Sequence, residues 1–207
     1  MRRRNSGTTS CVVVLVRGDP AFPARLGALP DCPRQVFVDG TLPEPGRRWV
    51  ALVGSRKATP AGRDIAHQLA RGLAEAGVVV VSGGAVGIDR AAHEGALAGA
   101  GTTVVVLPTS LGAPYPRGHA PLFRQVVAAG GACLAEHDDD APIAPWRFVA
   151  RNRLIAAAAE VVVVVEARAS SGTAATAVAA RRLGRRVAAL PWRVGDEGGA
   201  GCLALLH

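Results

Sequence analysis

The sequence has 207 residues, of which 49% are hydrophobic and 19% are charged, and its formal net charge is +8. This composition is typical of one folded domain with a sizeable core and excludes a disordered chain. No apolar run reaches the roughly 20 residues that a membrane-spanning helix needs. The apolar run 12–16 is also too short for the core of a signal peptide, so we expect a cytoplasmic protein with no membrane partner.

The charge balance favours a polyanionic partner, because excess positive charge attracts nucleic acids over long range. A general bias toward arginine on the surface is the alternative, since Lys57 is the only lysine. The four cysteines lie far apart and form no C-x-x-C pair, which predicts neither a metal site nor a disulfide framework.

The chain changes character near residue 49. Residues 1–10 are predicted to be a flexible tail, and residues 11–48, rich in proline and glycine, an irregular arm that adds one or two edge strands. From 49 to 207, valine-rich runs alternate with helical stretches. We predict strands at 50–53, 78–81, 103–107, 133–135, 161–165 and 187–190, and helices at 60–76, 88–98, 121–129, 146–158 and 173–183.

This alternation predicts an α/β fold in a single domain, with a Rossmann-like, doubly wound and mostly parallel sheet. Nearly continuous valine in the strands indicates that both faces of the sheet are covered. In such sheets ligands bind beyond the carboxyl ends of the strands. Four loops there are rich in small or charged residues and are expected on one rim: 54–56, 82–89, 108–116 and 166–176.

The loop 82–87 is the strongest motif. Its sequence, Ser-Gly-Gly-Ala-Val-Gly, joins a buried strand to a helix, where backbone N–H groups can approach an anion. The glycines Gly83, Gly84 and Gly87 are predicted to leave room for a phosphate beside Ser82. The loop lacks the lysine of a P-loop and the G-x-G-x-x-G spacing, so it predicts neither ATP hydrolysis nor ordinary NAD binding.

The helix after this loop begins with two polar residues of interest. Asp89 either caps the helix start or faces the ligand. His93 lies one turn later on the same helical face, where we expect a packed or surface histidine rather than a catalytic base.

Three further segments offer anion contacts. Gly54, Ser55 and Arg56 combine a turn, a hydroxyl and a planar guanidinium, although an ordinary turn with a surface arginine would have the same sequence. The second small-residue loop places hydroxyls before a helix at Ser171, Gly172 and Thr173. In the third segment, Arg151, Asn152 and Arg153, we expect one guanidinium in the cleft, or else a buried ion pair with Glu136 or Glu166.

Glu166 itself ends a strand and is predicted either to bind a ribose or base hydroxyl or to cap a neighbouring loop. We find no catalytic residues: no G-x-S-x-G occurs, no Ser-His-Asp set can be assigned, and no metal cluster or cofactor is expected. Aromatic residues are few, so single-strand binding would depend on backbone charge more than on base stacking.

Taken in chain order, these motifs resemble the DprA/Smf family of DNA-processing proteins. The resemblance runs from about Phe22 to Leu190. It is carried by 22–26 and 29–33 in the arm, and by 52–56, 81–89, 91–97, 115–116, 151–156, 165–167 and 171–173 in the core.

The resemblance implies a Rossmann-like homodimer without enzymatic activity. It implies that the protein binds single-stranded DNA during natural transformation and helps to load the recombinase RecA. The family's positive pocket corresponds here to Ser55, Arg56, 82–87, Arg151 and Arg153.

The sequence departs from the family pattern in the main motif and near its end. Val86 stands where the family usually has arginine, which removes an expected phosphate contact, and Gly84 loosens the same loop. Cys202 lies near an expected asparagine. Since the sequence stops at His207, we expect neither the winged-helix module of many members nor an N-terminal helical domain of the usual size.

A nucleotide-derivative binding protein or a phosphoribohydrolase of the Lonely Guy type is the alternative, because its general shape is similar and the missing arginine would suit a smaller anion. The Pro-Gly-Gly-x-Gly-Thr signature of those hydrolases is absent, and 171–173 is the nearest match to it.

Overall fold

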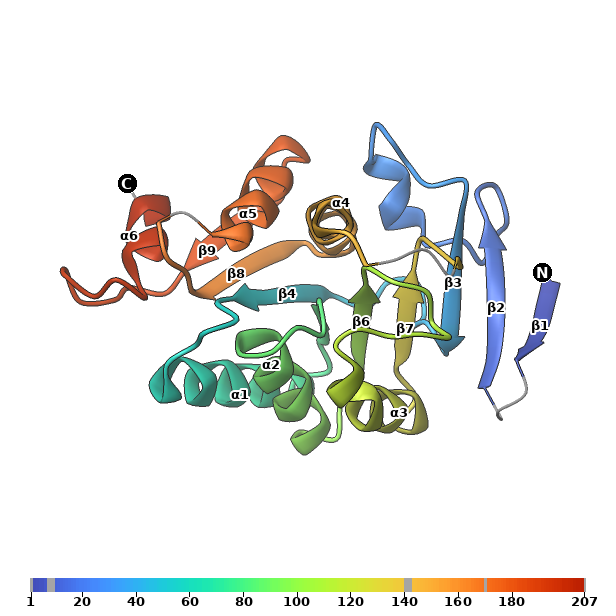
Figure 1. The fold of residues 1–207 in the computed structure, drawn as a ribbon, viewed down its shortest axis with the longest axis horizontal. Helices are drawn as coiled ribbons and strands as arrows, with labels where there is room; N and C mark the ends of the chain where they lie inside the picture. The colour runs from blue at the N-terminus through green and yellow to red at the C-terminus, as the bar shows by residue number, and fades with distance from the viewer. Residues whose placement is uncertain (1, 7–9, 140–142, 170, 207) are drawn as a thin grey trace.

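The computed structural model describes residues 2–6, 10–139, 143–169 and 171–206, and the side chains from residue 12 onward. These residues form one nine-stranded sheet in the order β1-β2-β3-β7-β6-β5-β4-β8-β9 (Figure 1). Six strands, from β7 to β9 in that order, run parallel. They are β4 (Trp49–Gly54), β5 (Val79–Ser82), β6 (Thr103–Leu107), β7 (Ala132–Ala135), β8 (Val161–Glu166) and β9 (Arg186–Ala189).

Helices cover both faces of this sheet, which confirms the predicted doubly wound α/β fold. Figure 1 shows α1 (Pro60–Glu75), α2 (Ile88–Ala98) and α3 (Ala120–Ala128) on one face. The other face carries α4 (Pro145–Ala158), α5 (Gly172–Arg182) and α6 (Ala200–Leu206). The five predicted helices and six predicted strands all exist, with ends within one or two residues of those expected.

Valine explains the central strands. β5 and β6 are buried along their whole length, because α1 and α2 pack on one face and α4 on the other. A strand buried on both faces needs side chains that are apolar everywhere and favour extended backbone, which valine satisfies. Burial therefore fixes the sheet's centre, and the loops at its carboxyl edge are held on a rigid support.

The arm adds two strands at one side of the sheet, as the sequence predicts. It forms β2 (Ser10–Val16), the short 3-10 helix η1 (Ala24–Ala28) and β3 (Gln35–Gly40), and β3 pairs antiparallel with β7. Part of the expected flexible tail is the strand β1 (Arg2–Ser6), paired with β2. β1 pairs with its neighbour along the chain, whereas β3 pairs with a strand far away in sequence, which local composition does not reveal.

The first helix shows how local residues set the element ends. The Thr59 hydroxyl accepts a hydrogen bond from the Gly62 amide, and Pro60 occupies the first turn, where its missing N–H costs nothing. After α1, Gly77 turns the chain with φ of +75° into β5. A second 3-10 helix, η2 (Arg117–His119), precedes α3.

The described residues contain neither a membrane-spanning helix nor a cluster of metal-ligating side chains. None of their helices has the length and apolar character that crossing a bilayer requires. They also contain no group of three or more His, Cys, Asp or Glu side chains that could hold a metal ion.

Candidate nucleic-acid interface

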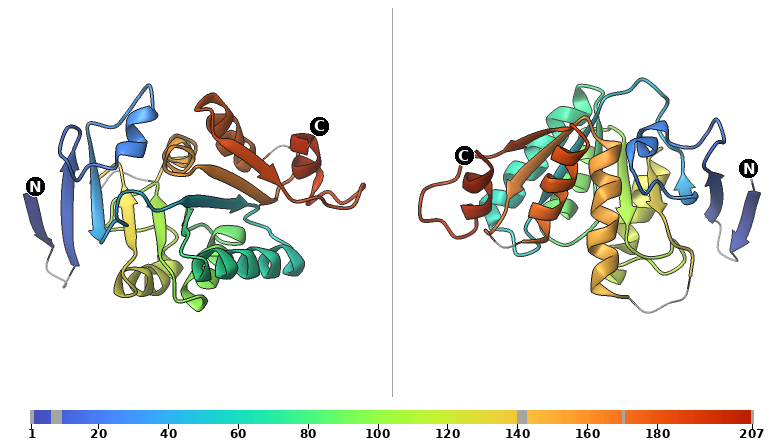
Figure 2. Two further views of the ribbon diagram at one scale, coloured as in Figure 1. Left: turned by 180° about the vertical axis from the view of Figure 1, so that it is seen from behind. Right: turned by 90° about the horizontal axis from the view of Figure 1, so that it is seen from above.

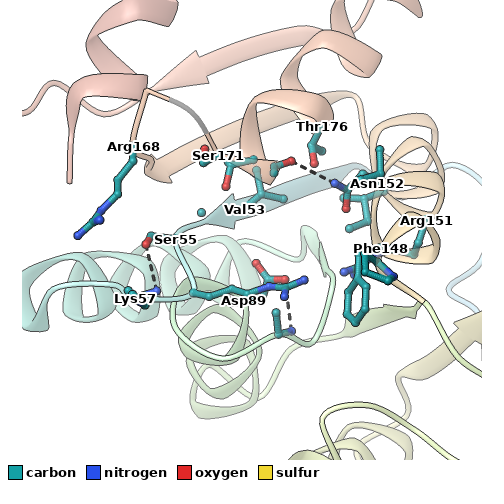
Figure 3. Close-up of a pocket in the computed structure, with 18 of the residues that line it drawn as sticks. Val53, Ser55, Lys57, Asp89, Phe148, Arg151, Asn152, Arg168, Ser171 and Thr176 are labelled. Carbon is teal, nitrogen blue, oxygen red and sulfur yellow. Dashed lines mark hydrogen bonds between the residues drawn. The ribbon is translucent and has the colours of Figure 1, made fainter. Parts of the chain in front are cut away.

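A cavity of about 710 Å³ lies at the carboxyl edge of the sheet, where β4 and β8 end between α4 and α5 (Figure 3). Its walls come from the loop after β4, the start of α2, the first turns of α4 and the start of α5. The volume falls within the range of small-molecule and cofactor sites. The predicted rim loops therefore do meet in one place, as parallel strands require.

Basic side chains dominate the charge of this cavity. Arg56, Lys57, Arg151 and Arg168 line it, and Asp89 is the one acidic side chain among its described lining residues. Three of the four basic residues are exposed, whereas Arg151 is 5% exposed and forms part of the floor. Such an arrangement gives the cavity a positive electrostatic potential, which attracts anions.

Arg151 is oriented by the protein itself. Its Nη1 donates to the Val106 carbonyl oxygen at 2.6 Å, and the guanidinium packs against Gly83. Burial lowers the pKa of Arg151 to about 10, with Asp89 opposing the shift and Arg56 adding to it. The group is still charged near neutral pH, and its buried Nε has no partner within the described structure.

Asp89 faces the same cavity from the first turn of α2. Its Oδ2 accepts a long hydrogen bond from the Ala85 amide, at 3.4 Å. Burial raises the pKa of Asp89, and Arg151 counters this effect. Asp89 thus ties back the loop before its helix and lines the cavity, but it does not cap α2, whose N-cap is Gly87 without a side-chain cap bond.

Aromatic faces border the cavity beside Arg56. The Arg56 guanidinium lies 4.6 Å from the ring centre of Phe148, and Tyr115 meets Phe148 edge to face at 5.5 Å. These three residues and Arg151 also line a smaller recess of about 40 Å³ next to the main cavity. The chain's few aromatics are therefore better placed for contact with a base than their number predicts.

The start of α5 forms the opposite wall. Ser171 precedes the helix and makes no side-chain cap within the described structure, and its buried Oγ has no partner there. Gly172 is exposed, with no described atom within 4 Å of the place a Cβ would take. Asn152 donates from Nδ2 to the Gly172 carbonyl at 3.2 Å, which joins α4 to α5 (Figure 3). Within the described structure no side chain caps this helix start, which is the end of a helix that offers N–H groups to an anion.

Most of the loop 82–87 lies outside the main cavity. Ser82 is fully buried and donates to the Leu52 carbonyl at 2.6 Å, and neither it nor the three glycines line the main cavity. A Cβ on Gly83 would strike Arg151, and one on Gly87 would strike the Ser55 carbonyl. Protein atoms therefore fill the space on the Cβ side of these glycines, while Gly83 lines the smaller recess and Gly87 lines a separate cavity.

Gly84, the remaining glycine of this loop, is hydrogen-bonded to a side chain from another part of the fold. His119 is buried, and its Nδ1 lies 2.9 Å from the Gly84 carbonyl oxygen. Since a carbonyl only accepts, this nitrogen is the one that carries the proton. A Cβ on Gly84 would approach Val105 and Phe123 within 3 Å, so packing against α3 also demands glycine here.

Arg153 does not join the cavity either. It lies two residues after Arg151 on α4, which turns it to another side of the helix. There it forms ion pairs with Asp31 at 2.6 Å and with Glu136 at 2.8 Å. The ion pair that the sequence suggested for this segment therefore exists, and its partner is Glu136 rather than Glu166.

Hydrogen bonds define the roles of Glu166 and His93. Glu166 is 1% exposed and accepts hydrogen bonds from the Thr59 amide at 3.0 Å and the Thr59 hydroxyl at 2.8 Å, so it caps a neighbouring loop. His93 is fully buried with Nδ1 2.8 Å from the Thr103 hydroxyl, so it is a packed histidine. Burial lowers the pKa of His93 to about 3, with His119 and Arg151 contributing.

The sequence missed some residues of the site. Phe148, Arg168 and Thr176 line the cavity. Phe148 stands three residues before Arg151 and so shares its helical face, a spacing that could have pointed to it. Val86, in place of the family arginine, is 45% exposed and lies outside the main cavity, beside the smaller recess.

The Rossmann-like sheet, with a basic cavity at its carboxyl edge, places the chain among the doubly wound α/β proteins. The sequence profile of the DNA recombination-mediator protein A family matches residues 13–207. The chain therefore belongs to this family, DprA/Smf, as its motifs led us to expect.

The relatives are longer than this chain. A Mycobacterium tuberculosis protein that carries the DprA name is 49% identical over 166 residues, which is 80% of this chain and 42% of the relative. Protein Smf of Escherichia coli is 38% identical, over 90% of this chain and 50% of the relative. The chain thus spans about half the length of these two relatives.

Solved structures of the family share the fold. The Streptococcus pneumoniae DprA structure superposes with a TM-score of 0.85 at 34% identity, covering 94% of this chain and 68% of that one. The Helicobacter pylori structure, described for its single-stranded DNA binding mode, gives 0.81 at 32% identity, covering 94% and 86%.

Proposed function

We propose that this chain binds single-stranded DNA in the cavity between α4 and α5, without catalysis. The observation that carries the proposal is the gathering of Arg56, Lys57, Arg151 and Arg168 around one cavity whose far wall is an uncapped helix start. Phosphates of the strand meet this wall and the exposed cations. The single-stranded DNA binding mode described for the Helicobacter pylori relative supports the same ligand class.

The bases have a separate place in this proposal. Phe148 and Tyr115 offer aromatic faces beside Arg56, and stacking on such faces tolerates any base. Backbone charge and stacking together suit a strand of mixed sequence. The open mouth of the cavity lets the rest of the strand leave on either side.

The wider role follows from membership of the family. As a DNA recombination-mediator protein, the chain would deliver bound single strands to a recombinase of the RecA type, and by resemblance it would act as a homodimer. Natural transformation is the process in which we place this step. Gly54, Ser55, Asn152 and Thr173 would shape the cavity, whereas Arg153 is removed from the set of DNA contacts.

The test measures oligonucleotide affinity against ionic strength. Arg56→Ala with Arg168→Ala removes two exposed cations of the cavity, and Arg71→Ala with Arg182→Ala removes two exposed cations at the far ends of α1 and α5. By fluorescence anisotropy with a labelled 20-mer of thymidine, the cavity pair should weaken binding about tenfold or more. It should also flatten the slope of log K against log salt by about 1.4, because each phosphate contact on a single strand contributes roughly 0.7.

The control pair carries the same loss of charge and should leave the slope within error of the parent chain. Equal effects of the two pairs would show that only net charge matters and would refute the cavity as the site. A thermal shift with a mononucleotide such as AMP, and none with oligonucleotides, would favour the nucleotide-derivative alternative.

A further inference from the structure

Two arginines on α4, two residues apart, serve different sides of the helix. Arg151 points to the cavity floor, and Arg153 points toward the arm. Figure 2 shows α4 lying between α5 and the arm segment that contains η1. Successive residues are about 100° apart around an α-helix, so these two side chains diverge by roughly 200°. Any rotation of α4 that moves one must move the other.

Arg153 is bound through all three guanidinium nitrogens. Nε donates to the Asp31 carboxylate at 2.6 Å, and Nη1 and Nη2 donate to the two oxygens of Glu136 at 2.8 Å each. Asp31 follows η1 in the arm and Glu136 follows β7, so one side chain on α4 connects two other parts of the fold. Arg153 and Glu136 are only 18% and 20% exposed.

This geometry is the strong form of an ion pair. Two parallel N–H···O bonds from an arginine to one carboxylate fix orientation as well as distance, and partial burial limits screening. Burial alone would lower the pKa of Arg153, but the hydrogen bonds and charges of Glu136 and Asp31 outweigh it and raise the pKa. Because all three guanidinium nitrogens of Arg153 already donate to carboxylates, the side chain would have to break these bonds to contact a phosphate.

We propose that Arg153 is a positioning residue, which with Glu136 and Asp31 sets the rotation of α4 and thereby holds the Arg151 guanidinium in the cavity floor. The inference rests on the proposed function, because Arg151 matters only if the cavity binds DNA. A helix with side chains has a radius of about 5–6 Å, so a 20° rotation would move a side-chain tip by about 2 Å. That displacement breaks the 2.6 Å bond from Arg151 to Val106.

The change in DNA affinity expected for Glu136→Gln is opposite to the change that net charge alone predicts. Glu136→Gln removes one negative charge from the protein and weakens the hold on Arg153, which keeps its bonds to Asp31. If net charge governed affinity, or if Arg153 contacted phosphates directly, this variant would bind DNA more tightly. If Glu136 acts through the position of Arg151, the variant binds less tightly.

The first measurement is the affinity for the labelled thymidine 20-mer. We expect Glu136→Gln to weaken binding about fivefold and Asp31→Asn to weaken it less, because Asp31 is 64% exposed. The matched control is Glu75→Gln, which breaks the exposed Arg71–Glu75 pair at the end of α1 and should change affinity less than twofold. Melting temperatures are recorded for each variant to confirm that it is folded.

The second measurement needs no DNA. The buried Arg151 Nε–H should give a resolved arginine side-chain signal in a ¹H–¹⁵N NMR spectrum. Glu136→Gln should shift or broaden it and Glu75→Gln should not. Tighter or unchanged binding by Glu136→Gln, or an unmoved Arg151 signal, would overturn the positioning role. If the parent chain binds no oligonucleotide, the proposed function fails on its own, and the NMR signal still decides how Arg153 acts.

Discussion

Two small-residue loops at the carboxyl edge of the sheet look alike in sequence and differ in the structure. The closed loop, 82–87, leads from β5 into α2, and the open loop, 171–173, consists of the N-cap residue and the first two residues of α5, which follows β8. Around the first, a Cβ on any of the three glycines would meet protein atoms within 3 Å. Around the second, the Cβ position of Gly172 is open among the described atoms, and the helix start lines the cavity.

The difference teaches that a glycine can make room for two kinds of neighbour. In the closed loop the neighbours are the protein's own Arg151, Phe123 and the chain after β4. In the open loop no described atom lies within 4 Å of the Cβ position of Gly172, so the space beside it is free. A run of small residues before a helix predicts close approach, but the sequence does not say what approaches.

The largest expected effect comes from filling the closed loop. Gly83→Ala places a methyl group inside the space of the Arg151 guanidinium, which is buried and cannot withdraw freely. We expect the free energy of unfolding to fall by about 3 kcal/mol, at the upper end for overpacking. Urea denaturation measures it, and Gly172→Ala in the open loop serves as the control, with a change below about 1 kcal/mol. Similar losses of unfolding free energy in the two variants would contradict the difference between the closed and the open loop.

A smaller effect is expected from adding a carboxylate to the open loop. Gly172→Glu should reduce affinity for the thymidine 20-mer about tenfold, since the new charge stands where phosphates are proposed to bind. Stability should stay the same or rise by about 0.5 kcal/mol, because an acidic residue suits a helix start. Gly72→Glu, on an exposed part of α1, adds the same charge away from the cavity. Equal binding losses in the two variants would contradict an open anion site at α5.

The smallest predicted effect concerns His93, which shares its electrostatic surroundings with the closed loop through His119 and Arg151. The pKa of His93 in the folded chain, about 3, lies below the unfolded value near 6.5. Between these two pH values the unfolded chain binds a proton at His93 and the folded chain does not. Stability from this group is therefore present above pH 6.5 and is lost as the pH falls toward 3.

Between pH 7 and 5.5 this loss should amount to about 1 kcal/mol. His93→Leu should remove that part of the pH dependence, which urea denaturation at both pH values can measure. His67→Leu, at a partly exposed position, controls for losing any histidine. A parent chain and His93→Leu variant with parallel pH profiles would show that His93 accepts a proton in the folded state.

The core of the fold could be predicted because its signals are local. Valine runs such as Val79–Val81 are buried on both faces, and α1 has its cap and its glycine stop in its own sequence. The arm could not be predicted as fully. β3 depends on pairing with β7, nearly 100 residues further along the chain, and no local pattern carries that contact.

The site was predictable to the level of loops but not of side chains. Parallel topology brings the strand ends to one rim, so Arg56, Arg151 and Gly172 could be placed together in advance. Whether Arg153 faces the cavity depends on the rotation of α4 and on Asp31 and Glu136, which are distant in sequence. Ser82 likewise looked like a ligand hydroxyl, yet it is bound to Leu52.

The buried carboxylate of Glu166 has a consequence for ligand choice. In the usual dinucleotide enzymes of this architecture, the pyrophosphate sits at the start of the helix that follows the first parallel strand. Here that helix is α1, and Glu166 already receives the amide and hydroxyl of its Thr59 cap. The start of α1 therefore already has an acceptor from the protein itself at the place where those enzymes bind the pyrophosphate of a dinucleotide.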